Sequence, residues 1–361
     1  MQAVVLVGGE GTRLRPLTYG TPKPMVPIVG VPYLARTMER LFEAGIREVI
    51  LAAGYMPQAI VDYFGDGSRL DMEITYAIEQ EPLGTAGALK NVEQHLTGPF
   101  FVLNGDVLTS LDLTAMMAFH RQAGGLGVLH LIRVEDPSAF GCVVRGADGR
   151  IGRFVEKPPQ GSEPTDEVNA GTYLLEPEVL QAIPAGRNVS IERETFPQLL
   201  AAGKPLYAYV TQDYWIDLGR PEHYLAAHRD ILSGAMPLRL EPGLTGAVAQ
   251  AKHHSVRLFA PVHLDPDVQI EPGAEIGPNV VLGRGCRIGA GAVLRDCVLW
   301  EDVVVEAGAL IEEAIVASRT RIGRGSVIGR GSVIGHDVEV EAGSIVAPGA
   351  RLGPGTPLPI P

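Results

Sequence analysis

Short apolar runs alternate with longer amphipathic segments from the amino terminus to about residue 234. The apolar runs have the length of buried strands and lie at Ala3–Val7, Val49–Ala52, Ile74–Ala77 and Phe100–Leu103. The amphipathic segments have helical spacing and lie at about Tyr33–Ala44, Pro57–Phe64, Thr85–His95, Thr114–Ala123 and Glu222–Ser233. This alternation predicts an α/β fold with a largely parallel sheet, whose ligands bind at the carboxyl ends of the strands.

A six-residue repeat occupies residues 264–352. An aliphatic residue recurs at sixteen positions, and the register slips by one residue at Leu299 and again at Val316. One aliphatic residue on each face of a triangular coil fills the interior, and glycine permits the corners. Because three repeats make one coil, the pattern predicts a solenoid of about five coils. Cys286 and Cys297 fall within the repeats, where we expect packing thiols and not ligands.

These patterns predict an α/β domain at 1–234, a linker at 235–260, the solenoid at 261–354 and a proline-rich tail at 355–361. The total of 361 residues agrees with more than one domain. Acidic residues number 42 against 30 Lys and Arg, for a net charge of −12. This balance argues against a nucleic acid partner, because a phosphate backbone demands basic surface. A small phosphorylated substrate needs only a few local cations.

Targeting features are also missing from the sequence. No apolar run approaches the roughly 18 to 20 residues of a membrane span, and the amino-terminal run has no preceding basic segment, so we expect neither a membrane anchor nor a signal peptide. The three cysteines show no paired spacing, which fits a reducing compartment. A cytoplasmic location is the resulting expectation.

The loop after the first predicted strand carries the first chemical signal. Its segment Gly8-Gly-Glu-Gly-Thr-Arg13 holds three glycines whose backbone N–H groups can cradle phosphates. Arg13, and Lys23 within a Pro-Lys-Pro sequence, bring positive charge to the same space. The loop lacks the Gly-Lys-Ser/Thr of a Walker loop, and Leu14 stands where a dinucleotide fingerprint needs its third glycine.

Two short apolar strands lead into an aspartate. Asp106 ends the run Phe100-Phe-Val-Leu-Asn-Gly-Asp106, and Asp217 lies in Trp215-Ile-Asp-Leu-Gly219. An aspartate at the carboxyl edge of a sheet is well placed to hold Mg²⁺, which prefers one or two carboxylates with phosphate oxygens and water. Capping of the following turn is the alternative role for Asp106.

Several motifs together resemble a known family. Gly-x-Gly-Thr-Arg-Leu-x-Pro, followed about ten residues later by Pro-Lys-Pro, resembles the sugar-nucleotide pyrophosphorylases, which join an NTP to a sugar 1-phosphate and release pyrophosphate. Glu81-Pro-Leu-Gly-Thr-Ala-Gly87 and Ser190-Ile-Glu-Arg-Glu-Thr-Phe-Pro197 resemble the mannose-1-phosphate guanylyltransferase branch in its long form. The resemblance implies a Rossmann-like nucleotidyltransferase domain with a mixed, mainly parallel sheet, followed by a left-handed parallel β-helix of hexapeptide repeats.

The resemblance also implies roles for individual residues. The catalytic cations would be Arg13 near the leaving pyrophosphate, Lys23 near the α-phosphate, and Lys157 on the sugar phosphate. The nucleotide would lie against Gly8, Gly9, Gly11, Thr12, Glu79, Gly84 and Thr85. The sugar would lie against Gly141, Glu156, Asn169 and Gly171, and the cofactor Mg²⁺ would be bound by Asp106 and Asp217.

The resemblance implies that Glu79 contacts the base, since in that family the residue five positions before the glycine that corresponds to Gly84 does so. Thymidylyl and uridylyl relatives tend to carry glutamine at that place. A carboxylate only accepts hydrogen bonds, and guanine presents two adjacent donors, so Glu79 predicts GTP as the nucleotide. The resemblance to the mannose-1-phosphate guanylyltransferase branch implies mannose 1-phosphate as the second substrate. Glu81 is the rival base reader.

Three other functions remain open at this point. The first is thymidylyl or uridylyl transfer to glucose 1-phosphate, and the second is a regulatory paralogue that binds nucleotide sugar without turnover. The third is an acyltransferase with His336 as base, although a lone histidine at a repeat corner is typical of solvated surface. The flat faces of a stacked solenoid further predict a homo-oligomer.

Overall fold

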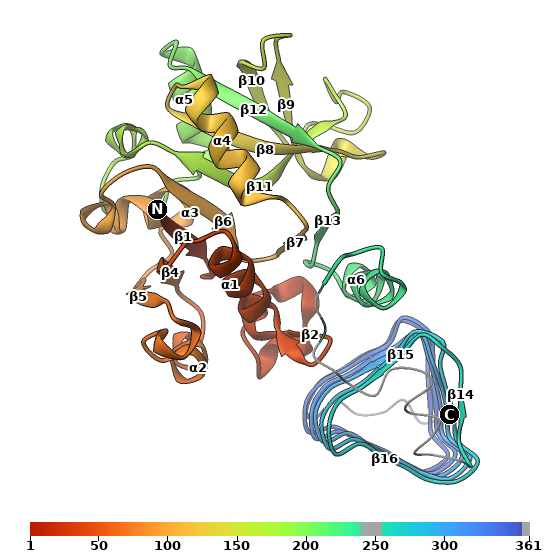
Figure 1. Cartoon of the computed structure of the whole chain (residues 1–361). Coiled ribbons are helices and arrows are strands. Elements are labelled where there is room, and N and C mark those ends of the chain that lie inside the picture. Colours follow the sequence, from red (N-terminus) through yellow and green to blue (C-terminus); the bar gives the residue numbers. More distant parts are fainter. Residues whose placement is uncertain (239, 241–254, 356–361) are drawn as a thin grey trace. The chain divides into compact units, whose positions relative to one another are not determined.

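The structure is a computed structural model and describes residues 1–238, 240 and 255–355 (Figure 1). The described chain forms two compact units. The first contains Met1–Gly9 and Leu34–Trp215, and the second contains Glu10–Tyr33 and the chain from Ile216 onward. Most of the predicted linker and nearly all of the predicted tail lie outside the described residues, and the predicted domain boundaries stay predictions.

The first unit is built on a mixed nine-stranded sheet with a main strand order of β10-β9-β11-β6-β1-β4-β5, to which β8 and β12 add through β11. Its amino-terminal half is parallel, as the apolar runs predict, because β6, β1, β4 and β5 pair in parallel. The antiparallel strands β9, β10 and β11 follow, and β8 pairs antiparallel with β11 and parallel with β12. The nine strands of this sheet are β1 (Gln2–Leu6), β4 (Glu48–Ala53), β5 (Glu73–Ile78), β6 (Phe100–Asn104), β8 (Gly127–Arg133), β9 (Gly141–Arg145), β10 (Ile151–Glu156), β11 (Glu167–Leu175) and β12 (Leu206–Thr211). The short strand β7 (Val107–Thr109) is not part of this sheet.

Helices cover this sheet with their apolar faces. Leu34, Met38 and Leu41 of α1 recur at helical spacing and are all buried. Asp112 caps α4 by accepting a hydrogen bond from the Ala115 N–H, and α4 packs on β8, β11 and β12 (Figure 1). The bounds are α1 (Tyr33–Glu43), α2 (Pro57–Phe64), α3 (Gly84–Asn91), α4 (Leu113–Ala123) and α5 (Phe196–Ala201), with a π-helical segment η8 (Ile191–Thr195) before α5. The helix predicted to end at residue 95 instead ends at Asn91, and a separate 3-10 turn follows it.

The second unit begins with the segment that carries Arg13 and Lys23. This segment forms 3-10 turns and a small hairpin: η1 (Thr12–Leu14), η2 (Leu17–Tyr19), η3 (Lys23–Met25), β2 (Pro27–Ile28) and β3 (Val31–Pro32). The chain returns to this unit at β13 (Trp215–Asp217), whose first residue belongs to the first unit, and continues into α6 (Pro221–Ser233).

A three-sided parallel β-helix completes the second unit (Figure 1). Over the described residues its three sheets hold six, six and five strands, which agrees with the expected five coils. The first sheet contains β14 (Arg257–Leu258), β17 (Glu275–Ile276), β20 (Val293–Arg295), β23 (Leu310–Glu312), β26 (Val327–Ile328) and β29 (Ile345–Val346). The second contains β15 (Val262–Leu264), β18 (Val280–Leu282), β21 (Val298–Leu299), β24 (Ile315–Val316), β27 (Val333–Ile334) and β30 (Arg351–Leu352). The third contains β16 (Gln269–Ile270), β19 (Arg287–Ile288), β22 (Val304–Val305), β25 (Arg321–Ile322) and β28 (Glu339–Val340).

The repeated aliphatic residues stack in register inside this β-helix. Leu264 pairs with Leu282, which in turn pairs with Leu299 on the next coil. Cys286 and Cys297 are fully buried in the same core, as expected, and burial raises the pKa of the Cys286 thiol to about 12. The left-handed sense of the β-helix stays a prediction.

Candidate active site

The first unit gathers polar residues where its parallel strands end. Gly8 and Gly9 follow β1, Glu79 follows β5, and Asp106 follows β6, so all four lie at the carboxyl edge of one sheet. The edge of a parallel sheet is the usual place for a ligand. The structure thus brings these four sequence-predicted residues to one side of the first unit.

Glu79 is held beside the glycine-rich loop. Its backbone N–H donates to Ala53 O, and its Oε2 accepts a hydrogen bond from the Leu83 N–H at 3.1 Å. A Cβ on Gly8 would lie 3.9 Å from the same Oε2, so the carboxylate borders the loop. Burial raises the pKa of the half-buried Glu79, whereas its rival Glu81 is exposed.

The Asn104-Gly-Asp106 turn depends on its glycine. Gly105 donates to Leu6 O at 2.9 Å, and a Cβ on Gly105 would fall on that same carbonyl oxygen. This close approach ties the turn to β1 and leaves Asp106 at the sheet edge. Asn104, which sequence reasoning passed over, has a buried Oδ1 with no hydrogen-bond partner among the described residues.

Glu156 and Lys157 end β10 opposite Gly141. Gly141 pairs with Glu156, and a Cβ on Gly141 would lie 2.5 Å from Glu156 Oε2, so only glycine fits there. The Lys157 ammonium lies 3.8 Å from Glu156 Oε1, and the lysine side chain is 58% exposed. The backbone of Lys157 has a φ of 48°, a left-handed conformation that costs a non-glycine residue about 1–3 kcal/mol.

Burial raises the pKa of Glu156, and the nearby Glu192 carboxylate raises it further. The Lys157 and Arg193 cations act in the opposite direction with smaller effect. Glu156 is therefore a carboxylate that takes up a proton more readily than an exposed glutamate does.

Glu192 is a site residue that sequence reasoning missed. Its Oε2 accepts hydrogen bonds from the Thr85 and Ser190 hydroxyls, both at 2.9 Å, and its Oε1 accepts from the buried Tyr173 hydroxyl at 3.3 Å. It lies in η8, and π-helical segments are common at functional sites. The only sequence signal was its position in the segment Ser190–Pro197.

The Tyr173 hydroxyl links Glu192 to the predicted sugar residues. It accepts a hydrogen bond from Asn169 Nδ2 at 2.7 Å, while Asn169 Oδ1 accepts from the Gly171 N–H at 3.1 Å. Burial raises the pKa of Tyr173 well above its usual value. The predicted sugar residues therefore belong to a connected polar network in one unit.

The network also occupies the hydroxyl of Thr85. This hydroxyl donates to Glu192 and accepts from the Ile191 N–H at 2.8 Å, so its proton is already used. Gly84 has a φ of 69°, and a Cβ there would press on Val189 O at 2.6 Å. Nucleotide contacts by Gly84 and Thr85 stay predictions.

In the second unit, Gly11, Thr12 and Arg13 enter η1 and pack beside Lys23. A Cβ on Gly11 would lie 2.9 Å from the Lys23 Cβ, and Gly11 O accepts a hydrogen bond from the Thr18 hydroxyl at 2.9 Å. The structure therefore places the two cations of the loop, Arg13 and Lys23, in the same compact unit.

Arg13 also lies beside Asp217. Arg13 Nη2 is 3.9 Å from Asp217 Oδ2, while Asp217 Oδ1 accepts a hydrogen bond from the Gly219 N–H at 2.5 Å. A Cβ on Gly219 would lie 2.5 Å from Arg13 Nη2 and 2.6 Å from Asp217 Oδ1, so glycine allows the three residues to meet. Hard cations prefer carboxylate oxygens such as Asp217 Oδ2, so Asp217 is suited to be one of the ligands of an Mg²⁺ ion. Asp106 belongs to the first unit, and its pairing with Asp217 on one metal stays a prediction.

His336 is not a solvated corner residue, and that expectation was wrong. It is only 7% exposed, its Nε2 lies 3.1 Å from Leu17 O and 3.2 Å from the Thr21 hydroxyl, and its ring packs on Trp300. Burial lowers the pKa of His336. The segment of the glycine-rich loop covers this histidine, which leaves it a packing role and speaks against a catalytic base for acyl transfer.

No group of three or more His, Cys, Asp and Glu side chains in residues 1–238, 240 and 255–355 is placed to hold a metal ion. No helix in that part of the chain has the length and apolar character to span a bilayer.

Comparison with known families assigns both parts of the chain. Residues 2–234 match the nucleotidyl transferase family, and residues 258–352 match the family described as the GMPPB C-terminal domain. The chain therefore belongs to the nucleotidyl transferase family, which confirms the resemblance found in its motifs.

Individual relatives agree with this assignment. The chain is 46% identical to mannose-1-phosphate guanylyltransferase of Mycobacterium tuberculosis, over 68% of each chain. It is 42% identical to mannose-1-phosphate guanylyltransferase catalytic subunit beta of Danio rerio, over 69% of this chain and 71% of the relative. Among solved structures it resembles HddC from Yersinia pseudotuberculosis complexed with GMP-PN, with a TM-score of 0.55 and 32% identity over 64% of this chain and 99% of HddC.

Proposed function

We propose that this chain transfers the guanylyl group of GTP to mannose 1-phosphate, giving GDP-mannose and pyrophosphate. An oxygen of the sugar phosphate attacks the α-phosphorus of GTP and forms a new P–O bond. The bond from that phosphorus to the oxygen bridging the β-phosphorus breaks, and pyrophosphate leaves with the electron pair. No protein nucleophile is needed, because positioning and charge neutralisation are the main requirements of such a reaction.

One observation carries the proposal: Arg13, Lys23 and Lys157 each place a positive charge in a motif of the family, one for each phosphate group in the reaction. Arg13 beside Asp217 would receive the leaving pyrophosphate, and Lys23 would lie near the α-phosphate. The exposed Lys157 ammonium would neutralise the attacking sugar phosphate, and Glu156 would accept hydrogen bonds from the sugar hydroxyls. The relatives named mannose-1-phosphate guanylyltransferase support the same reaction.

The finer substrate assignment rests on Glu79. Its ionised carboxylate would accept hydrogen bonds from the N1–H and N2 amine of guanine. The GMP-PN complex of HddC supports a guanine nucleotide for this fold. Asn169 and Gly171, with the Tyr173 and Glu192 network behind them, would line the mannose site.

The cofactor in this proposal is Mg²⁺ held by Asp106 and Asp217. When bound, it would neutralise triphosphate charge, with phosphate oxygens and water as its other ligands. Asp217 has one carboxylate oxygen on the Gly219 N–H, and its other oxygen faces Arg13. The Arg13 guanidinium beside Asp217 would supply a further positive charge for the phosphates.

A matrix of nucleotides and sugar 1-phosphates tests the reaction. Pyrophosphate release would be measured for GTP, UTP, dTTP and ATP, each with mannose 1-phosphate and glucose 1-phosphate. We expect GTP with mannose 1-phosphate to give the highest kcat/KM. Faster turnover of dTTP or UTP with glucose 1-phosphate would favour the thymidylyl or uridylyl reading. Nucleotide-sugar binding without any turnover would favour a regulatory paralogue.

The metal assignment makes the first testable prediction. Asp106→Asn and Asp217→Asn should each remove most Mg²⁺-dependent turnover while the circular dichroism spectrum stays unchanged, because each removes a charge without a change of shape. Asp62→Asn, at an exposed aspartate of α2, is the control. Near-normal turnover in either site variant would remove that residue from the metal site.

Assembly and location belong to the same proposal. A homo-oligomer would form through the faces of the β-helix, where Ile345 and Phe259 are large exposed apolar residues. The three cysteines are free and buried, which supports a reducing location such as the cytoplasm.

A further inference from the structure

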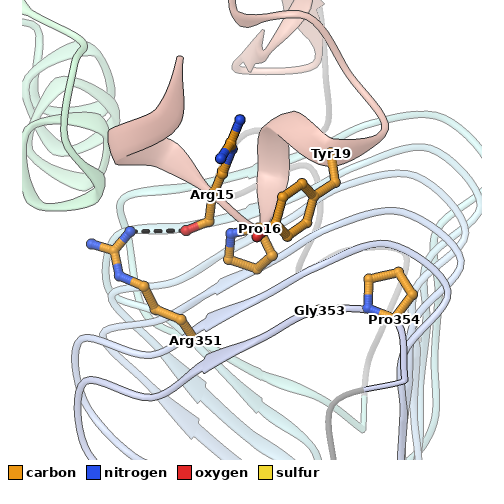
Figure 2. Close-up of a pocket in the computed structure, with 6 residues that line it drawn as sticks. All are labelled: Arg15, Pro16, Tyr19, Arg351, Gly353 and Pro354. Atoms are coloured by element: carbon orange, nitrogen blue, oxygen red, sulfur yellow. Dashed lines mark hydrogen bonds between the residues drawn. The ribbon is translucent and has the colours of Figure 1, made fainter. Parts of the chain in front are cut away.

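The last strand of the β-helix reaches the turn that carries Arg13. Arg351 opens β30, and its Nη1 donates hydrogen bonds to the carbonyl oxygens of Arg13 at 2.7 Å and Arg15 at 2.8 Å. Figure 2 shows the guanidinium directed at the Arg15 carbonyl, beneath the turn. One nitrogen thus bridges the two carbonyls on either side of Leu14.

These carbonyls are not used by the turn itself. The 3-10 turn η1 is closed by bonds from Leu14 N to Gly11 O and from Arg15 N to Thr12 O. The carbonyl oxygens of Arg13 and Arg15 do not take part in these two bonds. They stand at the end of the turn, where a donor from another segment can bind them. A guanidinium suits this place because it is always charged and its donors are fixed in one plane.

The rest of the loop packs on the same end of the β-helix. His336 contacts Leu17 O and the Thr21 hydroxyl, and a Cβ on Gly335 would lie 3.1 Å from the Pro16 ring. These contacts hold the segment that follows the turn. Arg351 instead donates hydrogen bonds to carbonyl oxygens of the turn that carries Arg13.

Open space on the far side of Arg351 makes its hydrogen bonds more important. A cavity of about 590 Å³ lies there, lined by Arg15, Pro16, Tyr19, Arg351, Gly353 and Pro354 (Figure 2). The Arg15 guanidinium lies over the Tyr19 ring at 5.4 Å and also pairs with Glu10 at 3.0 Å. Beside this cavity, the described polar contacts of the turn with the β-helix include those from Arg351 to the carbonyls of Arg13 and Arg15.

We propose that Arg351 is a positioning residue for nucleotidyl transfer. By fixing the backbone of η1, it sets the direction of the Arg13 side chain toward the triphosphate and Asp217. This inference rests on the proposed function, in which Arg13 receives the leaving pyrophosphate. It gives the β-helix an indirect part in the chemistry, through Arg13, beyond assembly.

The experiment uses Arg351→Met and Arg351→Lys in the full chain, with initial rates in both directions. We expect Arg351→Met to raise the KM for GTP, and for pyrophosphate in the reverse reaction, while the KM for mannose 1-phosphate stays within about twofold. A loss of about ten- to a hundredfold in kcat/KM for GTP is expected, since small displacements of a catalytic group cost that much. Arg351→Lys should recover part of it, because an ammonium can reach one carbonyl but does not have the planar fork.

Two controls separate positioning from simple destabilisation. Arg330→Met removes another β-helix guanidinium, which pairs with Glu312 at 3.7 Å, and should leave the kinetics unchanged. The double variant Arg13→Met with Arg351→Met should lose no more activity than Arg13→Met alone, because Arg351 acts through Arg13. A merely structural role would give additive losses, equal for both substrates.

The outcomes are distinct. A wild-type chain without turnover on any substrate pair would overturn the proposed function. An active wild type with normal KM values in folded Arg351→Met, or additive losses in the double variant, would overturn the positioning role. Should Arg351→Met fold poorly, Arg351→Lys decides: an unchanged KM for GTP would contradict the proposal, and a selective increase would support it.

Discussion

A carboxylate offers guanine two acceptor oxygens, and Glu79 keeps that capacity in the folded chain. Its Oε2 accepts from the Leu83 N–H, and each carboxylate oxygen has two lone pairs, so the side chain keeps acceptor capacity. Its position after β5 and beside Gly8 is that of a residue at the mouth of a sheet-edge site. Glu81 is exposed.

Glu79→Gln should therefore weaken GTP use more than UTP or dTTP use. The carboxamide keeps one acceptor but turns an N–H₂ toward a guanine donor. Hydrogen bonds to a charged group contribute about 1.5–3 kcal/mol, so kcat/KM for GTP relative to UTP should fall about ten- to a hundredfold. Glu81→Gln is the matched control, and a selectivity change in that variant alone would make Glu81 the base reader.

Glu156 makes the sugar site sensitive to pH. Its pKa is raised by burial and by Glu192, so on acidification it gains a proton at a higher pH than an exposed glutamate does. The protonated form is a poorer acceptor for sugar hydroxyls. The KM for mannose 1-phosphate should be constant at alkaline pH and rise as the pH falls through the raised pKa of Glu156.

Initial rates between pH 8 and 5 measure this effect, with Glu156→Gln as the reference. The sugar phosphate itself titrates near pH 6, by about the same amount for both proteins. The variant should have a higher KM at pH 8 and a flatter profile below it. Identical profiles for the two proteins would show that another group controls the pH dependence.

At the scale of elements, the π-helical segment η8 joins α3 to β11 through Glu192. Its carboxylate is the common acceptor for hydroxyls from Thr85 on α3, Tyr173 on β11 and Ser190 just before η8. Removal of this acceptor leaves the buried Tyr173 hydroxyl without a partner for its proton, at a cost of about 1–3 kcal/mol. The position of the sugar residues thus depends on a residue that need not touch the sugar.

We expect Glu192→Ala to lower the melting temperature by several degrees and to raise the KM for mannose 1-phosphate more than the KM for GTP. Thermal unfolding followed by fluorescence and initial-rate kinetics provide the two measurements. Glu178→Ala, at an exposed glutamate of the same unit, should change neither. A stability loss with no change in either KM would reduce Glu192 to a structural residue.

The β-helix shows how a sequence irregularity becomes a local structure. The two register slips fall at corresponding corners of successive coils, at Asp296 and Glu313, where φ is 48° and 46°. Both carboxylates pair with Arg229 of α6, at 3.1 Å and 3.4 Å. The tighter corners therefore coincide with the place where α6 docks on the β-helix.

At the scale of the whole molecule, the chain enters the second unit twice. The first passage brings in the loop with Arg13 and Lys23, and the second brings in α6 and the β-helix. Tyr224 joins the two passages, since its hydroxyl donates to Pro27 O at 2.5 Å and accepts from Trp300 Nε1 at 3.0 Å. The segment with Arg13 and Lys23 and the repeats are thus parts of one folded unit.

A chain cut after Ser233 should therefore bind GTP about tenfold more weakly, a change of about 1.4 kcal/mol, and melt at a lower temperature. Motif positions alone would predict normal nucleotide binding, because every phosphate motif lies before residue 234. Isothermal titration with GTP and light scattering test the loop and the assembly separately. A chain cut after Gly355 is the control. Unchanged affinity in the shorter chain would mean that the loop keeps its shape without the repeats.

The sequence alone determined the elements, because their periods are local. The sixteen aliphatic positions from Leu264 to Leu352 all fall in strands, β15 to β30. Among the described strands of the β-helix, the repeat pattern missed only β14, although Leu258 lies six residues before Leu264 and continues the period. The parallel half of the first sheet followed in the same way from runs of buried residues, and the family motifs supplied the roles of the charged residues.

Only the tertiary structure decided which distant groups meet. His336 looked solvated from its place in a repeat, yet the loop around Leu17 and Thr21 buries it. Arg351 and the Arg13 carbonyl that it binds are 338 residues apart in the sequence. No local period or motif records such a contact, because it arises from the packing of separate segments whose own patterns are satisfied without it.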